Sequence, residues 1–113
     1  MRDWDEAVAF ALTLPGAELS TSYRQPAVKV DGKAFLTTGH EPGSFHVRCP
    51  HDEKAVLIET DPDTFWQTPH YANWPGLLVR YGSPDPERVR RVLTRAWWDL
   101  AKPATRRLLG ERP

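Results

Sequence analysis

The residues best suited to binding a polyanion lie on a helix predicted near the C-terminal end of the chain, over 85–100. At about 100° per residue, Arg88, Arg91 and Arg95 form one stripe on this helix, and Trp98 follows on the same side. Guanidinium groups neutralise phosphates and an exposed indole ring stacks on bases. The pattern therefore predicts a nucleic-acid-binding stripe.

The same pattern also fits a solvent-exposed basic face with no ligand. Arg95 and Asp99 have the i,i+4 spacing of a helical ion pair, and Leu108 or Leu109 can fold back over Trp98. Both interpretations stay open at the level of the sequence.

Further positive charge follows in a predicted basic tail over 102–113, where Arg106 and Arg107 either continue along a phosphate backbone or belong to a frayed end. Lys33 lies in a predicted hairpin turn and is a third candidate contact to nucleic acid. Together, the candidate nucleic-acid-binding residues are Lys33, Arg88, Arg91, Arg95, Trp98, Arg106 and Arg107.

A second candidate site is the aromatic segment 68–76, which carries His70, Tyr71 and Trp74. A loop this aromatic either packs against the domain or recognises a partner. One interpretation places the three side chains at the edge of a pocket. The other is a loop held over the open face of a sheet by its rings.

Metal and nucleophile chemistry find little support in the sequence. The four histidines lack HxH and HxxxH spacing and have no multi-cysteine partner: His40, His46, His51 and His70. Cys49 is the single cysteine, and its apolar-alternating neighbours predict a buried, inert thiol. No nucleophile elbow or phosphate-binding loop is present, so we predict no cofactor, no metal and no catalytic activity.

Length and charge indicate how many domains the chain forms and where its positive charge lies. With 113 residues, 40% of them hydrophobic, the chain is predicted to form a single domain over 1–113. Its formal net charge is zero, but residues 1–70 carry −5 and residues 71–113 carry +5. No run of residues is long and apolar enough for a membrane span, and no secretory signal opens the chain, so we expect a cytoplasmic protein.

The elements that position the candidate sites follow from periodicity and turn residues. A first helix begins after Asp3 and ends before Pro15 and Gly16, and a second runs over 52–59. Between them the period changes to two, which predicts an antiparallel meander over 18–49 with one solvent-exposed face, where His46 and Arg48 point outward. A strand over 77–81 is expected to join it.

The most specific local signal is Asp31-Gly32, which favours a type I′ turn between strands 27–30 and 33–38 and would place Val28 opposite Phe35. The last helix is predicted to begin at its cap Asp85, with Pro86 in the first turn. Five apolar residues at helical spacing predict its core face: Val89, Val92, Leu93, Ala96 and Leu100. The predicted fold class is α+β, a two-layer sandwich of an antiparallel sheet against the terminal helices.

Four segments together resemble the MmcQ/YjbR family of small bacterial proteins: LTLPG at 12–16, PAVKVDGKAF at 26–35, TPHY at 68–71 and AWWDL at 96–100. The resemblance implies a two-layer α+β domain similar to frataxin-like proteins and secretion chaperones. The family is commonly labelled DNA-binding, with hairpin wings as contact elements, which here correspond to 31–33 and 39–44. The resemblance implies no catalytic residue.

Two functions are therefore carried forward. The first is binding of double-stranded DNA by the basic helix, the tail and the wings, although zero net charge is poor for grasping a polyanion. The second is a protein-binding or small-ligand-binding module that uses the exposed sheet face and the 68–76 segment. The sequence alone sets neither the ligand nor the oligomeric state.

Overall fold

The first helix and the last long helix begin where the capping residues predict. In the computed structural model, which describes residues 1–39 and 41–113, α1 (Trp4–Ala11) is capped by Asp3, whose carboxylate accepts the Glu6 N–H at 2.9 Å. α3 (Pro86–Leu100) is capped by Asp85, which accepts the Arg88 N–H at 3.1 Å. The remaining helical segments are α2 (His51–Thr60), the 3-10 turn η1 (Pro69–Tyr71) and α4 (Pro103–Arg106).

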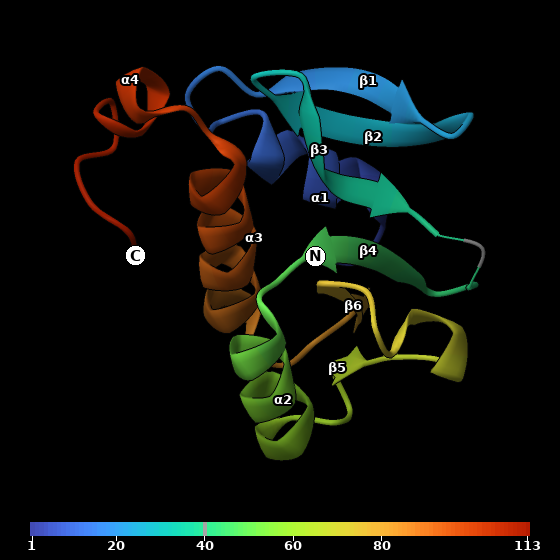
Figure 1. Cartoon of the computed structure of the whole chain (residues 1–113). Coiled ribbons are helices and arrows are strands. Elements are labelled where there is room, and N and C mark those ends of the chain that lie inside the picture. The colour runs from blue at the N-terminus through green and yellow to red at the C-terminus, as the bar shows by residue number, and fades with distance from the viewer. Residues whose placement is uncertain (40) are drawn as a thin grey trace.

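The described residues form one antiparallel sheet with the strand order β1-β2-β3-β4-β6-β5. The strands are β1 (Glu18–Ser22), β2 (Gln25–Val30), β3 (Lys33–Thr38), β4 (Ser44–Arg48), β5 (Phe65–Trp66) and β6 (Gly76–Arg80). β6 pairs with β4, as predicted for the 77–81 strand. Figure 1 shows α2 and α3 along one flank of the sheet and the yellow segment that leads into β6 at the opposite flank.

The hairpin at Asp31-Gly32 forms as predicted, with positive φ angles of 50° and 80° at the two turn residues. Its register differs from the prediction, because Val28 pairs with Leu36 rather than with Phe35. A β-bulge at Phe35 causes the shift, and the extra residue lets Phe35 and Leu36 both enter the core, where they are 1% and 0% exposed.

The core lies between the sheet and the helices α1 and α3, which confirms the α+β class and the two layers. Four of the five predicted core residues of α3 are buried, and Leu100 is half-buried. Trp97, which the predicted face omitted, is fully buried. Its indole Nε1 donates to the Pro15 carbonyl at 2.8 Å and so joins α3 to the turn after α1.

The second face of the sheet is less open than predicted. This outer face, which points away from α1 and α3, carries the cross-strand row Ala27, Thr37, His46 and Leu78. His46 is only 6% exposed, because Tyr71 and Trp74 from the segment between β5 and β6 lie over it. The expectation of a solvent-exposed His46 is therefore wrong: a non-local segment covers this part of the sheet.

Over the described ranges, 1–39 and 41–113, the structure has no helix of the length and apolarity that a membrane span needs.

Candidate functional site

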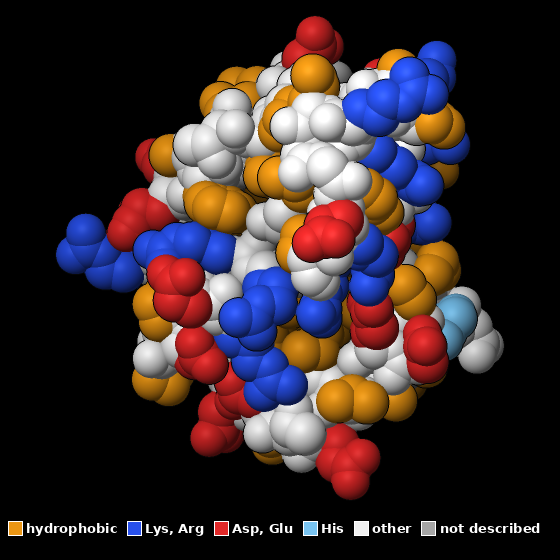
Figure 2. Space-filling view, turned by 90° about the vertical axis from the view of Figure 1, so that its left-hand side faces the viewer, with side chains coloured by type: hydrophobic (Ala, Val, Ile, Leu, Met, Phe, Trp, Pro, Cys, Tyr) orange, Lys and Arg blue, Asp and Glu red, His pale blue; other side chains and the backbone are white. Residues whose placement is uncertain are grey.

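The arginine stripe (Arg88, Arg91 and Arg95) lines a groove of about 370 Å³ between α2 and α3. The opposite wall of the groove carries Asp52 and Glu53, which come from the acidic first turn of α2. Figure 2 shows Lys and Arg side chains interspersed with Asp and Glu side chains over this face of the molecule. Opposite charges this close reduce the attraction of the stripe for a polyanion.

Two of the three stripe arginines have partners within the chain. The Arg88 guanidinium donates to Thr60 Oγ1 at 2.6 Å and lies 5.7 Å from the centre of the Phe65 ring. Arg95 Nε donates to the Pro113 carbonyl at 2.8 Å. Arg91 is exposed. Of the stripe, Arg91 is thus the side chain most available to an external phosphate.

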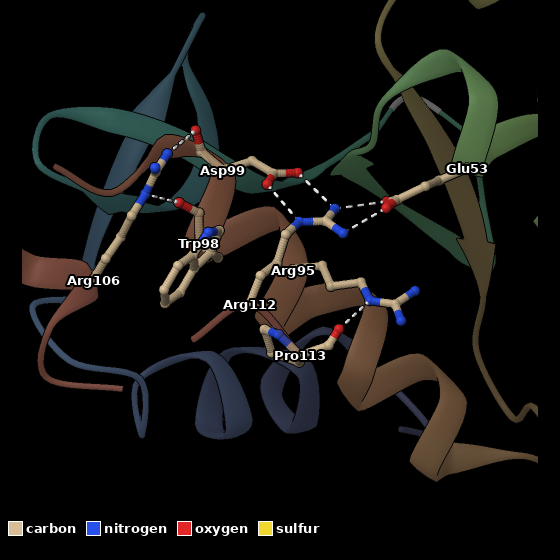
Figure 3. A network of polar contacts seen from close by, with 7 residues as sticks. All are labelled: Glu53, Arg95, Trp98, Asp99, Arg106, Arg112 and Pro113. Carbon is tan, nitrogen blue, oxygen red and sulfur yellow. Dashed lines mark hydrogen bonds and ion pairs between the residues drawn. The ribbon is translucent and has the colours of Figure 1, made fainter. Parts of the chain in front are cut away.

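Trp98 and Arg106 form one structural unit at the end of α3 (Figure 3). Arg106 Nε donates to the Trp98 carbonyl at 2.7 Å, and its second guanidinium nitrogen donates to the Asp99 carbonyl at 3.2 Å. The same guanidinium lies 5.5 Å from the centre of the half-buried Trp98 ring. Arg106 therefore satisfies the last carbonyls of α3, whereas its neighbour Arg107 is exposed.

Asp99 pairs with a residue that the sequence did not single out. Arg112 donates to Asp99 at 2.9 Å and to Glu53 of α2 at 2.8 Å, and thereby joins α2, α3 and the tail (Figure 3). The hydrogen bonds that Arg112 donates to these carboxylates raise its pKa above the usual value. The i,i+4 spacing suggested Arg95 as the partner of Asp99. The true partner, Arg112, was missed because an ion pair between distant segments leaves no local sequence pattern.

Lys33 does not lie with the stripe. It lines a separate cavity of about 440 Å³ over the outer face of the sheet, which we call the outer-face cavity. Ala34, Thr37 and His46 from β3 and β4 form part of its lining, and Ser22, Tyr23 and Gln25 contribute from the β1–β2 hairpin. The volume is within the range of small-molecule sites, roughly 300 to 1,000 Å³.

Tyr71 and Trp74 form the aromatic wall of the outer-face cavity. The Tyr71 ring meets His46 edge-on at 4.7 Å between centroids, and the Trp74 ring lies 5.6 Å from His46. His70 is exposed and packs edge-on against Tyr71 at 4.8 Å, outside the cavity lining. Two of the three residues predicted as a pocket edge thus lie at the cavity.

A buried lysine holds the backbone of the aromatic wall. Lys54 of α2 is 3% exposed, and its Nζ donates to the carbonyls of Tyr71, Ala72 and Trp74 at 3.0, 3.3 and 2.8 Å. Burial lowers the pKa of Lys54. The available sequence signal was periodicity, because residue 54 precedes the buried Leu57 by three positions on the same helical face.

Two glycines allow the aromatic rings to approach the backbone closely. A Cβ atom at Gly76 would lie 2.1 Å from Cζ3 of Trp74, and one at Gly39 would lie 2.2 Å from the His46 ring. No real Cβ atom tolerates such distances, so the ring positions require glycine at both sites. The aromatic wall is therefore a defined surface fixed from α2, β4 and β6.

The described residues bring together no group of three or more histidine, cysteine or carboxylate side chains able to hold a metal. His40 lies outside the described residues. Cys49 is 4% exposed, and burial raises the pKa of its thiol to about 12, as expected for an inert cysteine.

Comparisons with known proteins identify a matching family model and several relatives of this chain. Residues 12–99 match the family model described as YjbR. Uncharacterised proteins of Mycobacterium bovis and Mycobacterium tuberculosis are 30% identical to the chain over 80 residues, which cover 67% of the chain. The chain spans about 62% of the length of these relatives. No solved structure matches it.

Proposed function

This chain belongs to the YjbR family, and from that premise we propose that it is a binding protein whose site for a small organic ligand is the outer-face cavity. The observation that carries the proposal is the built aromatic wall. Tyr71 and Trp74 flank a cavity of about 440 Å³, and Lys54 fixes the backbone between them through three hydrogen bonds. A preformed concave site with aromatic lining and a few polar groups is typical of ligand binding.

The polar part of the lining includes neutral hydrogen-bonding groups beside the rings. Ser22, Thr37 and Thr38 contribute hydroxyls, and Gln25 contributes an amide whose Oε1 accepts the Thr38 hydroxyl at 3.1 Å. These groups orient a ligand by hydrogen bonds while the wall contributes stacking. We propose binding without chemical conversion, in the cytoplasm, so that a bound ligand is released unchanged.

The test uses a planar neutral probe, 2-naphthamide, followed by ligand-observed NMR and by the indole N–H signals of the protein. We expect binding that shifts the Trp74 signal and weakens about tenfold in Trp74→Leu, the loss expected for one stacking ring. Trp98→Leu is the matched control, because Trp98 is also half-buried but lies on α3 away from the cavity. Equal binding by wild type and Trp74→Leu would refute the proposed site.

Double-stranded DNA is a second candidate ligand, favoured by the exposed Arg91 and Arg107 in the positively charged part of the chain. In a duplex titration at several salt concentrations, Arg91→Gln should weaken binding and lower the salt slope by about one. Arg90→Gln is the control, because Arg90 already pairs with Glu87. If no binding is detected at about 50 mM salt, this second candidate is rejected.

A further inference from the structure

The charged residues of the outer-face cavity are all positive. Of the described residues that line it, Lys33 and Arg48 carry charge, and none is an aspartate or a glutamate. The opposite face of the molecule differs, because there the arginine stripe shares its groove with Asp52 and Glu53. An excess of positive charge in a concave, partly desolvated site attracts and holds anions.

Arg48 also differs from the other half-buried arginines in having no protein acceptor among the described residues. Arg90 pairs with Glu87, Arg95 donates to the Pro113 carbonyl, Arg106 donates to two carbonyls, and Arg88 donates to a hydroxyl. Arg48 is half-buried too, but it forms no ion pair or side-chain hydrogen bond with the described residues. A planar guanidinium at a cavity wall with its donors unused matches a carboxylate or phosphate group.

The sheet brings the two positive residues to the same end of the cavity. β3 begins at Lys33 and β4 ends at Arg48, and the strands are antiparallel neighbours with Leu36 opposite Val47. His46, which contacts both rings of the aromatic wall, lies two residues before Arg48 on the same face. On β4, the positively charged Arg48 thus lies two residues from His46, the residue that the two aromatic rings contact.

We infer that the ligand of the outer-face cavity is a small planar organic anion, whose negative group binds Lys33 and Arg48 while its ring stacks on Tyr71 and Trp74. This inference rests on the proposed function and adds the chemical class of the ligand. The cavity volume of about 440 Å³ suits one ring system with its acidic group. The hydroxyls of Ser22 and Thr37, which also line the cavity, add neutral donors for the same oxygens.

The experiment compares four probes that share one ring and differ in charge: 2-naphthoate, 2-naphthyl phosphate, neutral 2-naphthamide and the cation 2-naphthylmethylammonium. Affinities are measured by calorimetry or NMR for wild type, Arg48→Gln and Arg90→Gln. We expect both anions to bind wild type at least about tenfold more tightly than 2-naphthamide, the usual size of one charge-assisted contact, and the cation to bind most weakly. The two anions distinguish a carboxylate ligand from a phosphate ligand.

Arg48→Gln should abolish most of the preference for anions and leave the affinity for 2-naphthamide unchanged, whereas Arg90→Gln should behave like wild type. If 2-naphthamide binds as tightly as the anions, or if Arg48→Gln weakens all four probes equally, the anion inference is wrong. The proposed cavity then still stands, provided that Trp74→Leu weakens the neutral probe. If no probe binds in a manner that depends on Trp74, the cavity and the anion inference fall together.

Discussion

At the scale of single residues, Lys54 connects α2 to the segment that forms the aromatic wall. Its ammonium group is buried, and it donates to three main-chain carbonyls of one segment. A buried charge needs such partners, and the partners in turn lose their donors when the charge is removed. The lysine therefore connects the stability of the fold to the shape of the aromatic wall.

We predict that Lys54→Met lowers the free energy of unfolding by about 2 kcal/mol, because the methionine fills the space but leaves the carbonyls of the segment without a donor. Chemical denaturation measures this change. The same variant should broaden or shift the NMR signals of Tyr71 and Trp74. Lys102→Met, at an exposed lysine, is the control and should change neither. Unaltered stability in Lys54→Met would show that the three hydrogen bonds contribute little.

Sequence reasoning at this scale succeeded where the signal was local. Asp3 and Asp85 were identified as caps from the residues that follow them, and the backbone bonds confirm both. Lys54 was missed because a lysine in an acidic helix start is ordinarily solvent-exposed, and its acceptors lie 17 to 20 residues away. Arg48 was expected to point outward, and nothing local indicated that residues of later segments would line a cavity beside it.

At the scale of elements, α3 ends under a guanidinium cap supplied by α4. The last carbonyls of a helix lack internal donors and carry partial negative charge. Arg106 provides donors to two of them and also covers the Trp98 ring. In the structure, this arginine therefore serves the packing of the tail, and the adjacent Arg107 is exposed.

Arg106→Gln should destabilise the protein by about 1 to 2 kcal/mol, the cost of losing charged hydrogen bonds to the helix end together with the contact to Trp98. Arg107→Gln makes the same chemical change one residue later and should have almost no effect. The midpoint of urea denaturation measures both. Equal effects of the two substitutions would mean that Arg106 acts only through its charge.

The elements themselves were largely predictable, and their pairing was predictable only in part. Helical stripes, proline and glycine stops and the Asp31-Gly32 turn gave the approximate locations of α1, β2, β3, β4 and α3. The bulge at Phe35 was not visible, because it arises from burial of two adjacent residues against helices distant in the sequence. Likewise, the sequence did not distinguish the buried Trp97 from the half-buried Trp98. The difference arises because Trp97 faces the turn at Pro15, which is distant in the sequence.

At the scale of the whole molecule, the fold buries Cys49 and half-buries Tyr81, and ionisation of either group disfavours the native state. Burial raises the pKa of Cys49 from 9.0 to about 12 and that of Tyr81 from 10.0 to about 12, with Asp3 and Asp5 adding to the effect on Tyr81. In the unfolded chain both groups lose their protons at their usual pKa values. Between about pH 9 and 12 the unfolded state therefore binds fewer protons than the native state.

Because fewer protons are bound on unfolding, the free energy of unfolding should fall as pH rises from 9 to 12. Denaturation at successive pH values measures the slope. Cys49→Ala should reduce the slope over this interval, and Tyr81→Phe should reduce it above pH 10. A slope unchanged in both variants would show that neither group is responsible.

The contact between the Trp74 ring and the backbone at Gly76 has a consequence for how such a protein changes over evolutionary time. While tryptophan occupies position 74, any side chain at 76 is excluded, and the glycine becomes free to vary only after the ring is lost. Substitution at 76 first would displace the ring, whereas substitution at 74 first would only enlarge the cavity. The order of substitutions is thus constrained. In the evolution of the aromatic wall, we expect residue 74 to change before residue 76.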